Sequence, residues 1–250
     1  MVGVEPLQAL YPEKAVGGYS RVDGTIAFYG RVGALLADAG GRARVLDFGA
    51  GRGAFLDDHV RARRDVRLLR GRAGTVIGVD LDEAVLRNPA VDQAHVIEVG
   101  HRLPVADASV DLVVSDHCFE HIAEPAWAAR EIDRVLKPGG WLCARTPNRW
   151  GYIGIGARMV PNRLHVSVLR RLQPLKPAED TFPTTYLLNT PAALRRWFRP
   201  ESFDHVVWAM ENEPAYVGRS VAAARLAKAA SSLTPPPLRS ILLVFLHKNG

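Results

Sequence analysis

The sequence has little cysteine and no apolar run of membrane-spanning length. Cys118 and Cys143 are its two cysteines, they form no metal-like Cys pair, and a disulfide framework is therefore not expected. The longest strongly apolar stretch, ILLVFL at 241–246, suits a buried strand and is too short to cross a bilayer. The first ten residues lack the basic and apolar regions of a signal peptide. We therefore expect a cytoplasmic protein.

The chain also lacks a strong excess of charge and any internal repeat. Of its 250 residues, 48% are hydrophobic and 23% are charged, which is typical of a globular chain and not of a disordered one. This length predicts a single domain spanning residues 1–250. The net charge of +6 favours anionic partners, but it does not choose among nucleic acid, a membrane surface and an acidic metabolite.

Strand-like and helix-like patterns alternate over the first three fifths of the chain. Short apolar segments that end in glycine or an acid predict buried strands at 43–51, 75–82, 94–100, 109–119 and 140–148. Helical patterns precede or separate these strands, at 22–39, 55–64, 82–89 and 125–140. This alternation predicts βαβ units and a doubly wound, mostly parallel α/β sheet.

The pattern changes after the fifth predicted strand. Residues 149–189, which contain many arginines, prolines and glycines, are expected to form an inserted cap, and residues 1–24 an N-terminal lid. A helix is expected at 190–198, and two closing strands at 202–210 and 240–248. Because no further crossover unit joins them, these two strands predict an antiparallel pair at the edge, and hence a seven-stranded sheet with an antiparallel edge strand.

A glycine-rich turn follows the first predicted strand. The segment VLDFGAGRG places Asp47 at the strand end and glycines at Gly49, Gly51 and Gly53. Glycine lets the backbone approach a ligand closely at the start of the next helix. The third glycine comes two residues after the second, so the dinucleotide fingerprint does not fit. An acid before the glycines disfavours a pyrophosphate and favours a cationic or amine-bearing ligand.

A second acid ends the second predicted strand. The carboxylate of Asp80 can accept hydrogen bonds from both hydroxyls of a ribose. Glycine turns and capping aspartates also occur where no ligand binds, so the order of the later motifs has to decide between a ligand site and a purely structural turn.

That order resembles the class I S-adenosylmethionine-dependent methyltransferases. The motifs are VLDFGAGRG, VIGVDLD, LPVADASVDLVVSDHCFEHI and REIDRVLKPGGWLCARTPN. The resemblance covers residues 30–148 and points to the branch that contains ubiquinone-type O-methyltransferases and sugar and natural-product methyltransferases. It implies a Rossmann-like methyltransferase fold and S-adenosylmethionine as the cofactor. By this resemblance, Asp47 and the glycines of the turn surround the methionine part of the cofactor, Asp80 holds the ribose, and Leu81 packs on the adenine.

The adenine end departs from the family pattern. The family often has an adenine-binding Asp where this chain has Val99. Adenine is therefore expected to be read by the backbone at Gly100 and His101, or by Glu98. Further cofactor contacts are expected from Ser115, and from Tyr19 and Arg21 in the lid.

The segment SDHCFEHI contains His117, Glu120 and His121 in the H-x-x-E-H spacing of inverzincin zinc proteases. In those enzymes the motif lies inside a long helix, whereas here a strand precedes it and Pro125 follows it. A zinc protease is therefore not expected. The segment is instead predicted to turn from the fourth strand into a short helix, at the sheet edge where ligands bind.

Two interpretations of this segment remain. In the first, these side chains are structural. In the second, His117, Glu120 and His121 share one helical face beside the transferred methyl group. There, neutral His121 accepts the proton of an acceptor hydroxyl, or a divalent metal lowers the pKa of that hydroxyl. The resemblance implies a metal-binding acidic–x–x–Glu–His cluster, in which His117 replaces the first acid, so the metal is Mg²⁺ or another divalent ion.

The predicted cap is basic. Residues 149–178 contain six arginines or lysines and no acid. Either this is a solvated face, or it binds a negatively charged or membrane-presented acceptor, with His165, Arg170 and Arg171 as substrate contacts. The segment DTFPTTYLLNT at 180–190 resembles cap segments of methyltransferases for polysaccharide, glycolipid and natural-product synthesis.

We therefore expect an O-methyltransferase that acts on a hydroxyl of a saccharide, lipid-linked or natural-product acceptor. The alternatives are a C- or N-methyltransferase on a small molecule and a non-catalytic S-adenosylmethionine-binding protein. Nucleic acid is not an expected partner, because no N/D-P-P-Y-like motif follows the fourth strand. The sequence does not predict the oligomeric state.

Overall fold

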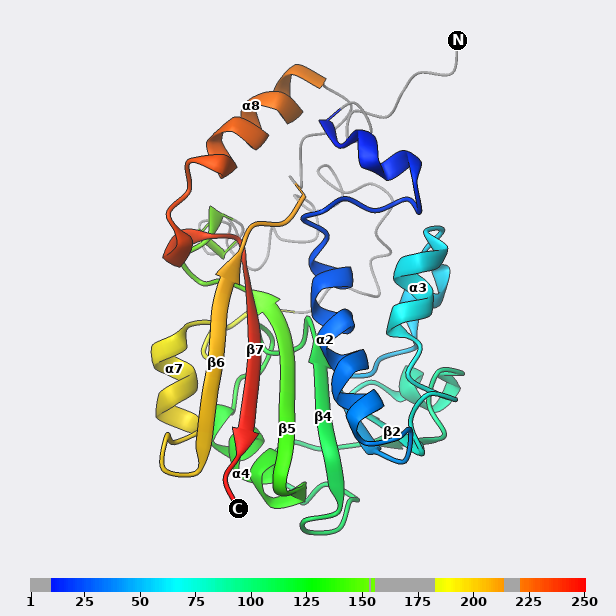
Figure 1. The fold of residues 1–250 in the computed structure, drawn as a ribbon. Helices are drawn as coiled ribbons and strands as arrows, with labels where there is room; N and C mark the ends of the chain where they lie inside the picture. The colour runs from blue at the N-terminus through cyan, green and yellow to red at the C-terminus, as the bar shows by residue number, and fades with distance from the viewer. Residues whose placement is uncertain (1–9, 153, 156–182, 214–220) are drawn as a thin grey trace.

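The computed structural model describes residues 10–152, 154–155, 183–213 and 221–250, and within them the chain forms one seven-stranded sheet (Figure 1). The strand order is β3-β2-β1-β4-β5-β7-β6. The strands are β1 (Arg44–Phe48), β2 (Thr75–Asp80), β3 (Gln93–Val96), β4 (Val110–Asp116), β5 (Leu136–Pro147), β6 (Phe203–Met210) and β7 (Ile241–Lys248).

The directions of the strands confirm the predicted doubly wound, mostly parallel sheet. Parallel pairing joins β3, β2, β1, β4 and β5, whereas β7 runs antiparallel to both of its neighbours, β5 and β6. The two closing strands pair with each other, as the sequence predicted. The antiparallel strand β7 lies one position in from the edge, because β6 pairs along its outer side.

Helices cover both faces of this sheet (Figure 1). The described helices are α2 (Gly24–Asp38), α3 (Arg61–Arg67), α4 (Pro125–Val135), α7 (Pro191–Trp197) and α8 (Val221–Ser232), of which α8 lies beyond one end of the sheet. Short 3-10 turns are η1 (Pro12–Ala15), η2 (Ala54–Asp57), η3 (Glu83–Arg87) and η5 (Pro236–Leu238). Phe28 of α2 belongs to one core cluster with Phe245 of β7, and Ile132 of α4 belongs to the other with Val244. Among the described residues, every helix falls short of the length and apolarity that crossing a membrane requires.

The helix predicted over residues 55–64 is interrupted. The chain forms η2, then an extended break, and then α3. Asp58 causes the break, because its carboxylate accepts a hydrogen bond from the backbone N–H of Val60 (2.9 Å) and offers the chain a local alternative to the helix. Arg63 reinforces this conformation through two hydrogen bonds to the same carboxylate (2.8 and 2.9 Å).

The glycine turn after β1 is fixed by its neighbours. The N–H groups of Gly49 and Ala50 both donate to the carbonyl of Val79 on β2 (2.9 and 3.1 Å). The side-chain amide of Asn88 donates to the carbonyls of Ala50 and Gly51 (3.0 and 3.1 Å). Gly53 has a φ of 76°, and a Cβ there would lie 2.5 Å from Oδ1 of Asn88. Glycine at this position thus allows both the backbone conformation and the approach of Asn88.

This geometry predicts a large penalty for Gly53→Ala. The matched control is Gly71→Ala, because Gly71 has a similar φ of 79° but no atom within 4 Å of an added Cβ. We expect the control to lower the free energy of unfolding by about 1 kcal/mol, from backbone strain alone. Gly53→Ala should lower it by about 3 kcal/mol, because Asn88 must also move. Urea unfolding measures both values, and equal losses would contradict the proposed role of Asn88.

Candidate functional site

Three acids lie at the carboxyl ends of adjacent strands, Asp47 on β1, Asp80 on β2 and Asp116 on β4. In open α/β sheets this edge is where ligands bind. Oδ2 of Asp80 accepts a hydrogen bond from the N–H of Gly51 (2.8 Å), and Oδ1 accepts one from the N–H of Asp82 (3.0 Å). Each carboxylate oxygen has a second lone pair, so Asp80 can still accept two hydroxyl donors.

The glycine turn beside Asp80 leaves room for a ligand. A Cβ added to Gly51, whose φ is 50°, would meet only Oδ2 of Asp80, at 4.0 Å. A ligand with two neighbouring hydroxyl groups could therefore donate hydrogen bonds to Asp80 from beside Gly51. The predicted contact between Asp80 and a ribose stays a prediction.

Asp47 carries an unusually basic carboxyl group. Burial and the negative charges of Asp116 and Asp80 raise its pKa, the guanidinium of Arg67 opposes them, and the net result is a pKa of about 7. A cationic ligand beside this carboxyl would favour its ionised form. An ammonium or sulfonium group of a ligand would supply such a positive charge beside Asp47.

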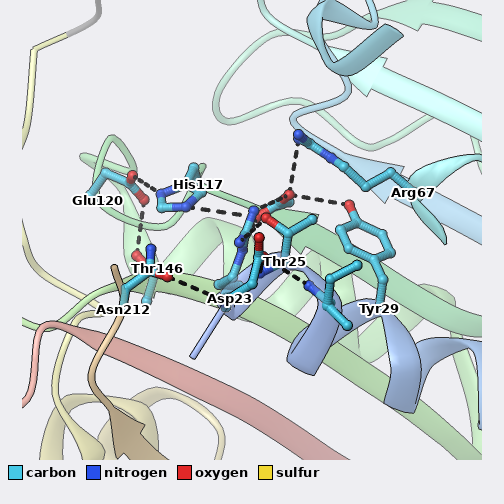
Figure 2. Close-up of polar contacts among 12 residues, drawn as sticks. Asp23, Thr25, Tyr29, Arg67, His117, Glu120, Thr146 and Asn212 are labelled. Atoms are coloured by element: carbon cyan, nitrogen blue, oxygen red, sulfur yellow. Dashed lines mark hydrogen bonds and ion pairs between the residues drawn. The ribbon is translucent and has the colours of Figure 1, made fainter. Parts of the chain in front are cut away.

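Two arginines hold the carboxyl group of Asp116 in the opposite, ionised state (Figure 2 labels Arg67, Tyr29 and Thr25 of this network). Arg145 donates to both of its carboxylate oxygens (2.7 and 2.9 Å), and Arg67 adds a third charged hydrogen bond (3.1 Å). The hydroxyl of Tyr29 lies 3.3 Å from Oδ2, and Arg145 also donates to Oγ1 of Thr25 (2.7 Å). Burial alone would raise the pKa of Asp116, but the two guanidinium groups lower it well below its usual range.

The sequence did not predict this network. Arg145 lies in the apolar segment WLCARTP, and a charged residue inside an otherwise buried strand is a signal that an opposite charge lies close by. Nothing in the sequence marks Arg67, because it is one of many arginines in the basic stretch before β2.

The segment His117–His121 forms a turn and not the predicted short helix. His117 has a left-handed φ of 56°, its N–H donates to the carbonyl of Arg145 (2.8 Å), and the N–H of His121 donates to the carbonyl of Cys118 (2.9 Å). The helix is not formed because β4 stays paired with β5 up to Asp116, and the chain must then reverse sharply.

The turn nevertheless gathers the three predicted side chains around one carboxylate (Figure 2 shows His117 and Glu120). Nδ1 of His117 lies 3.3 Å from Oε1 of Glu120, and Nε2 of His121 lies 4.0 Å from the same oxygen. Thr146 donates to the other oxygen, Oε2 (2.9 Å). The side chain of Glu120 is only 6% exposed. Burial alone would raise its pKa, but the hydrogen bond from His117 and the charges of both histidines lower it.

The other ring nitrogen of His121 fixes its tautomer. Nδ1 lies 2.8 Å from the carbonyl oxygen of Pro183, which can only accept a hydrogen bond. The neutral ring therefore carries its hydrogen on Nδ1 and its lone pair on Nε2. Nε2 is also the nitrogen that lies beside Glu120. His121 and Glu120 are therefore suited to act as a general base and a carboxylate that supports it.

These three side chains do not form the predicted metal site. Within the part of the chain that the structure describes, no group of three or more His, Cys, Asp or Glu is arranged to hold a metal ion. Oε2 of Glu120 is bonded to Thr146, and Nδ1 of His121 is bonded to Pro183. The prediction assumed a helix with all three side chains on one face, and the turn aims them at one another instead.

The predicted adenine contacts lie beside Asp80, at the ends of β2 and β3. Leu81 is 59% exposed, which leaves its side chain able to cover a ligand ring. The N–H of His101 donates to the carbonyl of Glu98 (3.2 Å), and its own carbonyl accepts from Nε1 of Trp127 (2.7 Å). The N–H of His101 is therefore not available to adenine, and a backbone contact at Gly100 stays a prediction.

The remaining predicted cofactor residues have structural partners. The buried hydroxyl of Ser115 donates to the carbonyl of Phe48 (2.9 Å) and thereby joins β4 to β1. The ring of Tyr19 packs beside Gly17, and the side chain of Arg21 is 73% exposed with Glu13 3.9 Å away. Their roles toward a cofactor stay predictions.

The lid and the cap are described in part. Between residues 10 and 24, Lys14 pairs with Glu213 (2.9 Å), and the N–H of Gly24 donates to Asn212 (3.0 Å), so this segment is anchored near the end of β6. Of the predicted cap at 149–189, the described residues are those at its two ends. The predicted substrate contacts His165, Arg170 and Arg171 lie outside the described residues.

Comparison with known proteins covers the same region. Residues 46–144 match a family model described as a methyltransferase domain. A protein of Mycolicibacterium smegmatis named as an S-adenosylmethionine-dependent methyltransferase is 39% identical over 112 residues, 42% of this chain and 38% of that protein. A ubiquinone biosynthesis O-methyltransferase of Paracidovorax citrulli is 33% identical over 126 residues, 46% of this chain and 47% of that protein. The matches thus span less than half the length of these curated relatives.

The fold extends beyond the matched sequence. A chain from the complex between the Haloferax volcanii Trm112 methyltransferase activator and a methyltransferase superposes with a TM-score of 0.51 at 19% identity, over 89% of this chain and 90% of that one. At this identity the similarity shows the fold alone. Residues 46–144 therefore resemble a methyltransferase domain in sequence, and the structural similarity extends the resemblance in fold to most of the chain.

Proposed function

We propose that the protein is an S-adenosylmethionine-dependent O-methyltransferase that acts on a hydroxyl of a saccharide, lipid-linked or natural-product acceptor. One contact carries the proposal. Cys118 packs directly on the glycine turn, where a Cβ added to Gly49 would lie 2.6 Å from its Sγ. The turn that bears His121 and Glu120 therefore touches the turn proposed to hold the cofactor, so a base and a methyl donor can meet there.

The chain supplies contacts for each part of the cofactor. The carboxylate of Asp80 would accept hydrogen bonds from the two ribose hydroxyls, and the glycine at position 51 would let the ligand approach the backbone. Asp47 would face the positive charge of the methionine part. When bound, the cofactor supplies a methyl group on a positively charged sulfur, which an oxygen nucleophile can attack in line.

His121 then handles the proton of the acceptor. Its Nε2 lone pair would accept the hydroxyl hydrogen as the oxygen takes the methyl group; the bond from that methyl carbon to the sulfonium sulfur would break, and a neutral thioether would leave. The imidazolium that forms lies 4.0 Å from Oε1 of Glu120, whose negative charge stabilises it. Pro183 holds the ring in the required tautomer throughout.

A hydroxyl oxygen is the favoured nucleophile because an alcohol or phenol needs a base to remove its proton, and His121 can act as that base. A carboxylate acceptor would need no base. The name of the Paracidovorax citrulli relative, an O-methyltransferase, supports the same choice. Six arginines or lysines and no acid in residues 149–178 support an acceptor that carries negative charge or is presented at an anionic membrane. Methylation of carbon or nitrogen on a small molecule is the alternative.

Replacing Asp80 tests the cofactor site. Asp80→Ala should weaken S-adenosylmethionine binding about 100-fold, because two hydroxyls lose a charged acceptor. The matched control is Asp82→Ala, which removes a neighbouring acid that caps η3. Isothermal calorimetry of both variants measures the effect. Wild-type affinity in Asp80→Ala would refute the ribose assignment.

Cofactor binding should depend on pH through Asp47. In the ligand-free protein its pKa is about 7, so the carboxyl is increasingly protonated as the pH falls below 7. A cationic ligand prefers the ionised form and lowers this pKa, so affinity should fall up to about tenfold per pH unit below pH 7. Calorimetry between about pH 5.5 and 7.5 follows this loss. Asp47→Asn should bind more weakly at pH 7.5 and lose the pH dependence, and a pH-independent wild type would contradict the prediction.

His121→Ala tests the proposed base. Its kcat should fall by about 10²–10⁴-fold, while S-adenosylhomocysteine binding stays unchanged. The control is His247→Ala, near the end of β7 farthest from the site. Transfer of labelled methyl to sugars, phenols, amines and n-octyl glucoside identifies the acceptor class and provides the assay.

Treatment with EDTA separates the base from a metal in that assay. A simple base predicts activity that EDTA does not change, whereas loss with EDTA and recovery with Mg²⁺ or Mn²⁺ would show that a metal is needed. Normal turnover in both His121→Ala and Glu120→Ala would show that the turn is structural.

A further inference from the structure

The segment 183–190, which we call the strap, lies against the turn that carries the proposed base. The carbonyl of Pro183 accepts from Nδ1 of His121 (2.8 Å). The N–H of Thr185 donates to the backbone carbonyl of Glu120 (2.7 Å). The strap therefore fixes the ring of one residue and the backbone of the other.

A buried relay also connects the strap to the carboxylate of Glu120. Nδ2 of Asn189 donates to Oγ1 of Thr146 (2.6 Å), and Oγ1 of Thr146 donates to Oε2 of Glu120 (2.9 Å). All three residues are buried. Asn189 also donates to the carbonyl of Pro147 (3.0 Å), which fixes the orientation of its amide.

The direction of these hydrogen bonds follows from the atoms involved. An amide nitrogen only donates, so the hydroxyl of Thr146 must accept from Asn189 and direct its own hydrogen at Glu120. The relay therefore holds Oε2, and with it the plane of the carboxylate. The other oxygen, Oε1, is left facing the two histidines (Figure 2 shows Thr146, Glu120 and His117).

The orientation of the Asn189 amide has an unfavourable consequence for its oxygen atom. Its Oδ1 is buried and has no hydrogen-bond partner among the residues that the structure describes. An unpartnered buried carbonyl is unfavourable, so the donor contacts to Thr146 and Pro147 must outweigh it. This observation is independent of the distances and shows that the amide is held by its donor side.

We propose that Thr146 and Asn189 are positioning residues for the base. They orient the carboxylate of Glu120 so that its Oε1 faces His117 and His121. The proposal rests on the proposed function. Because Asn189 is the last residue of the predicted cap, it also makes the end of the cap part of the support for the base.

Nitrogen-15 NMR of the imidazole rings tests this positioning directly, with S-adenosylhomocysteine bound. Thr146→Val keeps the shape of the side chain but removes the hydroxyl, so the carboxylate can turn and the Nδ1 signal of His117 should shift. Thr146→Ser restores the hydroxyl and should restore the wild-type signal. The matched control is Thr185→Val, which removes a strap hydroxyl that donates to the carbonyl of Ile122 and not to the carboxylate.

A second variant tests the direction of the relay. Asn189→Asp replaces the donor with an acceptor, so the hydroxyl of Thr146 should turn toward the new carboxylate and away from Glu120. The Nδ1 signal of His117 should shift as in Thr146→Val. Thermal unfolding of each variant shows whether it is folded, and Thr146→Val decides the inference if Asn189→Asp does not fold.

The kinetic consequence is a loss in kcat. With n-octyl glucoside as the acceptor, Thr146→Val should lower kcat about tenfold, leave the KM for S-adenosylmethionine unchanged, and be rescued by Thr146→Ser. The imidazole signals decide the inference whether or not this glycoside is an acceptor.

The outcomes distinguish the inference from the proposed function. Unchanged imidazole signals in folded Thr146→Val would overturn the positioning role and leave methyl transfer by His121 intact. Full activity in His121→Ala would overturn the role of His121 as the base, and absence of methyl transfer to every acceptor class would overturn the proposed function; neither result would alter the wild-type signals on which the inference depends.

Discussion

The ion pair between Asp116 and Arg145 is the interaction on which the rest of the site depends. The two residues are direct partners across the parallel strands β4 and β5, and both are buried. A buried pair is stable only when its remaining donors and acceptors are also satisfied. Arg67 from α3 and Thr25 from α2 meet that need, so one ion pair joins two strands and two helices at the edge where the ligand is proposed to bind.

This pair also divides the charge of the site between two acids. Asp116 has two guanidinium groups and stays ionised, whereas Asp47 has burial and the negative charge of Asp116 against it, and its pKa rises to about 7. The two arginines thus keep Asp116 negatively charged, and this charge raises the pKa of Asp47 and favours a positively charged ligand beside it. A site that must bind a cation gains affinity from an acid that no cation of the protein neutralises fully.

The sequence predicted the parts of the fold that local patterns determine. Apolar segments that end in glycine or an acid predicted the positions of the strands, and the same pattern placed Asp80 at the end of β2. It did not predict the turn at 117–121, because strand pairing up to Asp116 overrides the helical spacing of His117, Glu120 and His121. For the same reason the three side chains do not share one face among the described residues, as the metal prediction assumed, and the metal itself stays a prediction. Long-range partners such as Arg67 for Asp116 have no local signal at all.

The residues that orient the proposed base lie far apart in the sequence. Glu120 lies in the turn after β4, Thr146 near the end of β5, and Asn189 at the end of the predicted cap. Three segments must therefore come together before the carboxylate is oriented toward His121. The proposed base thus depends on contacts between distant parts of the chain, in which Pro183 sets the tautomer of His121 and Asn189 sets the direction of the hydrogen bond from Thr146 to Glu120.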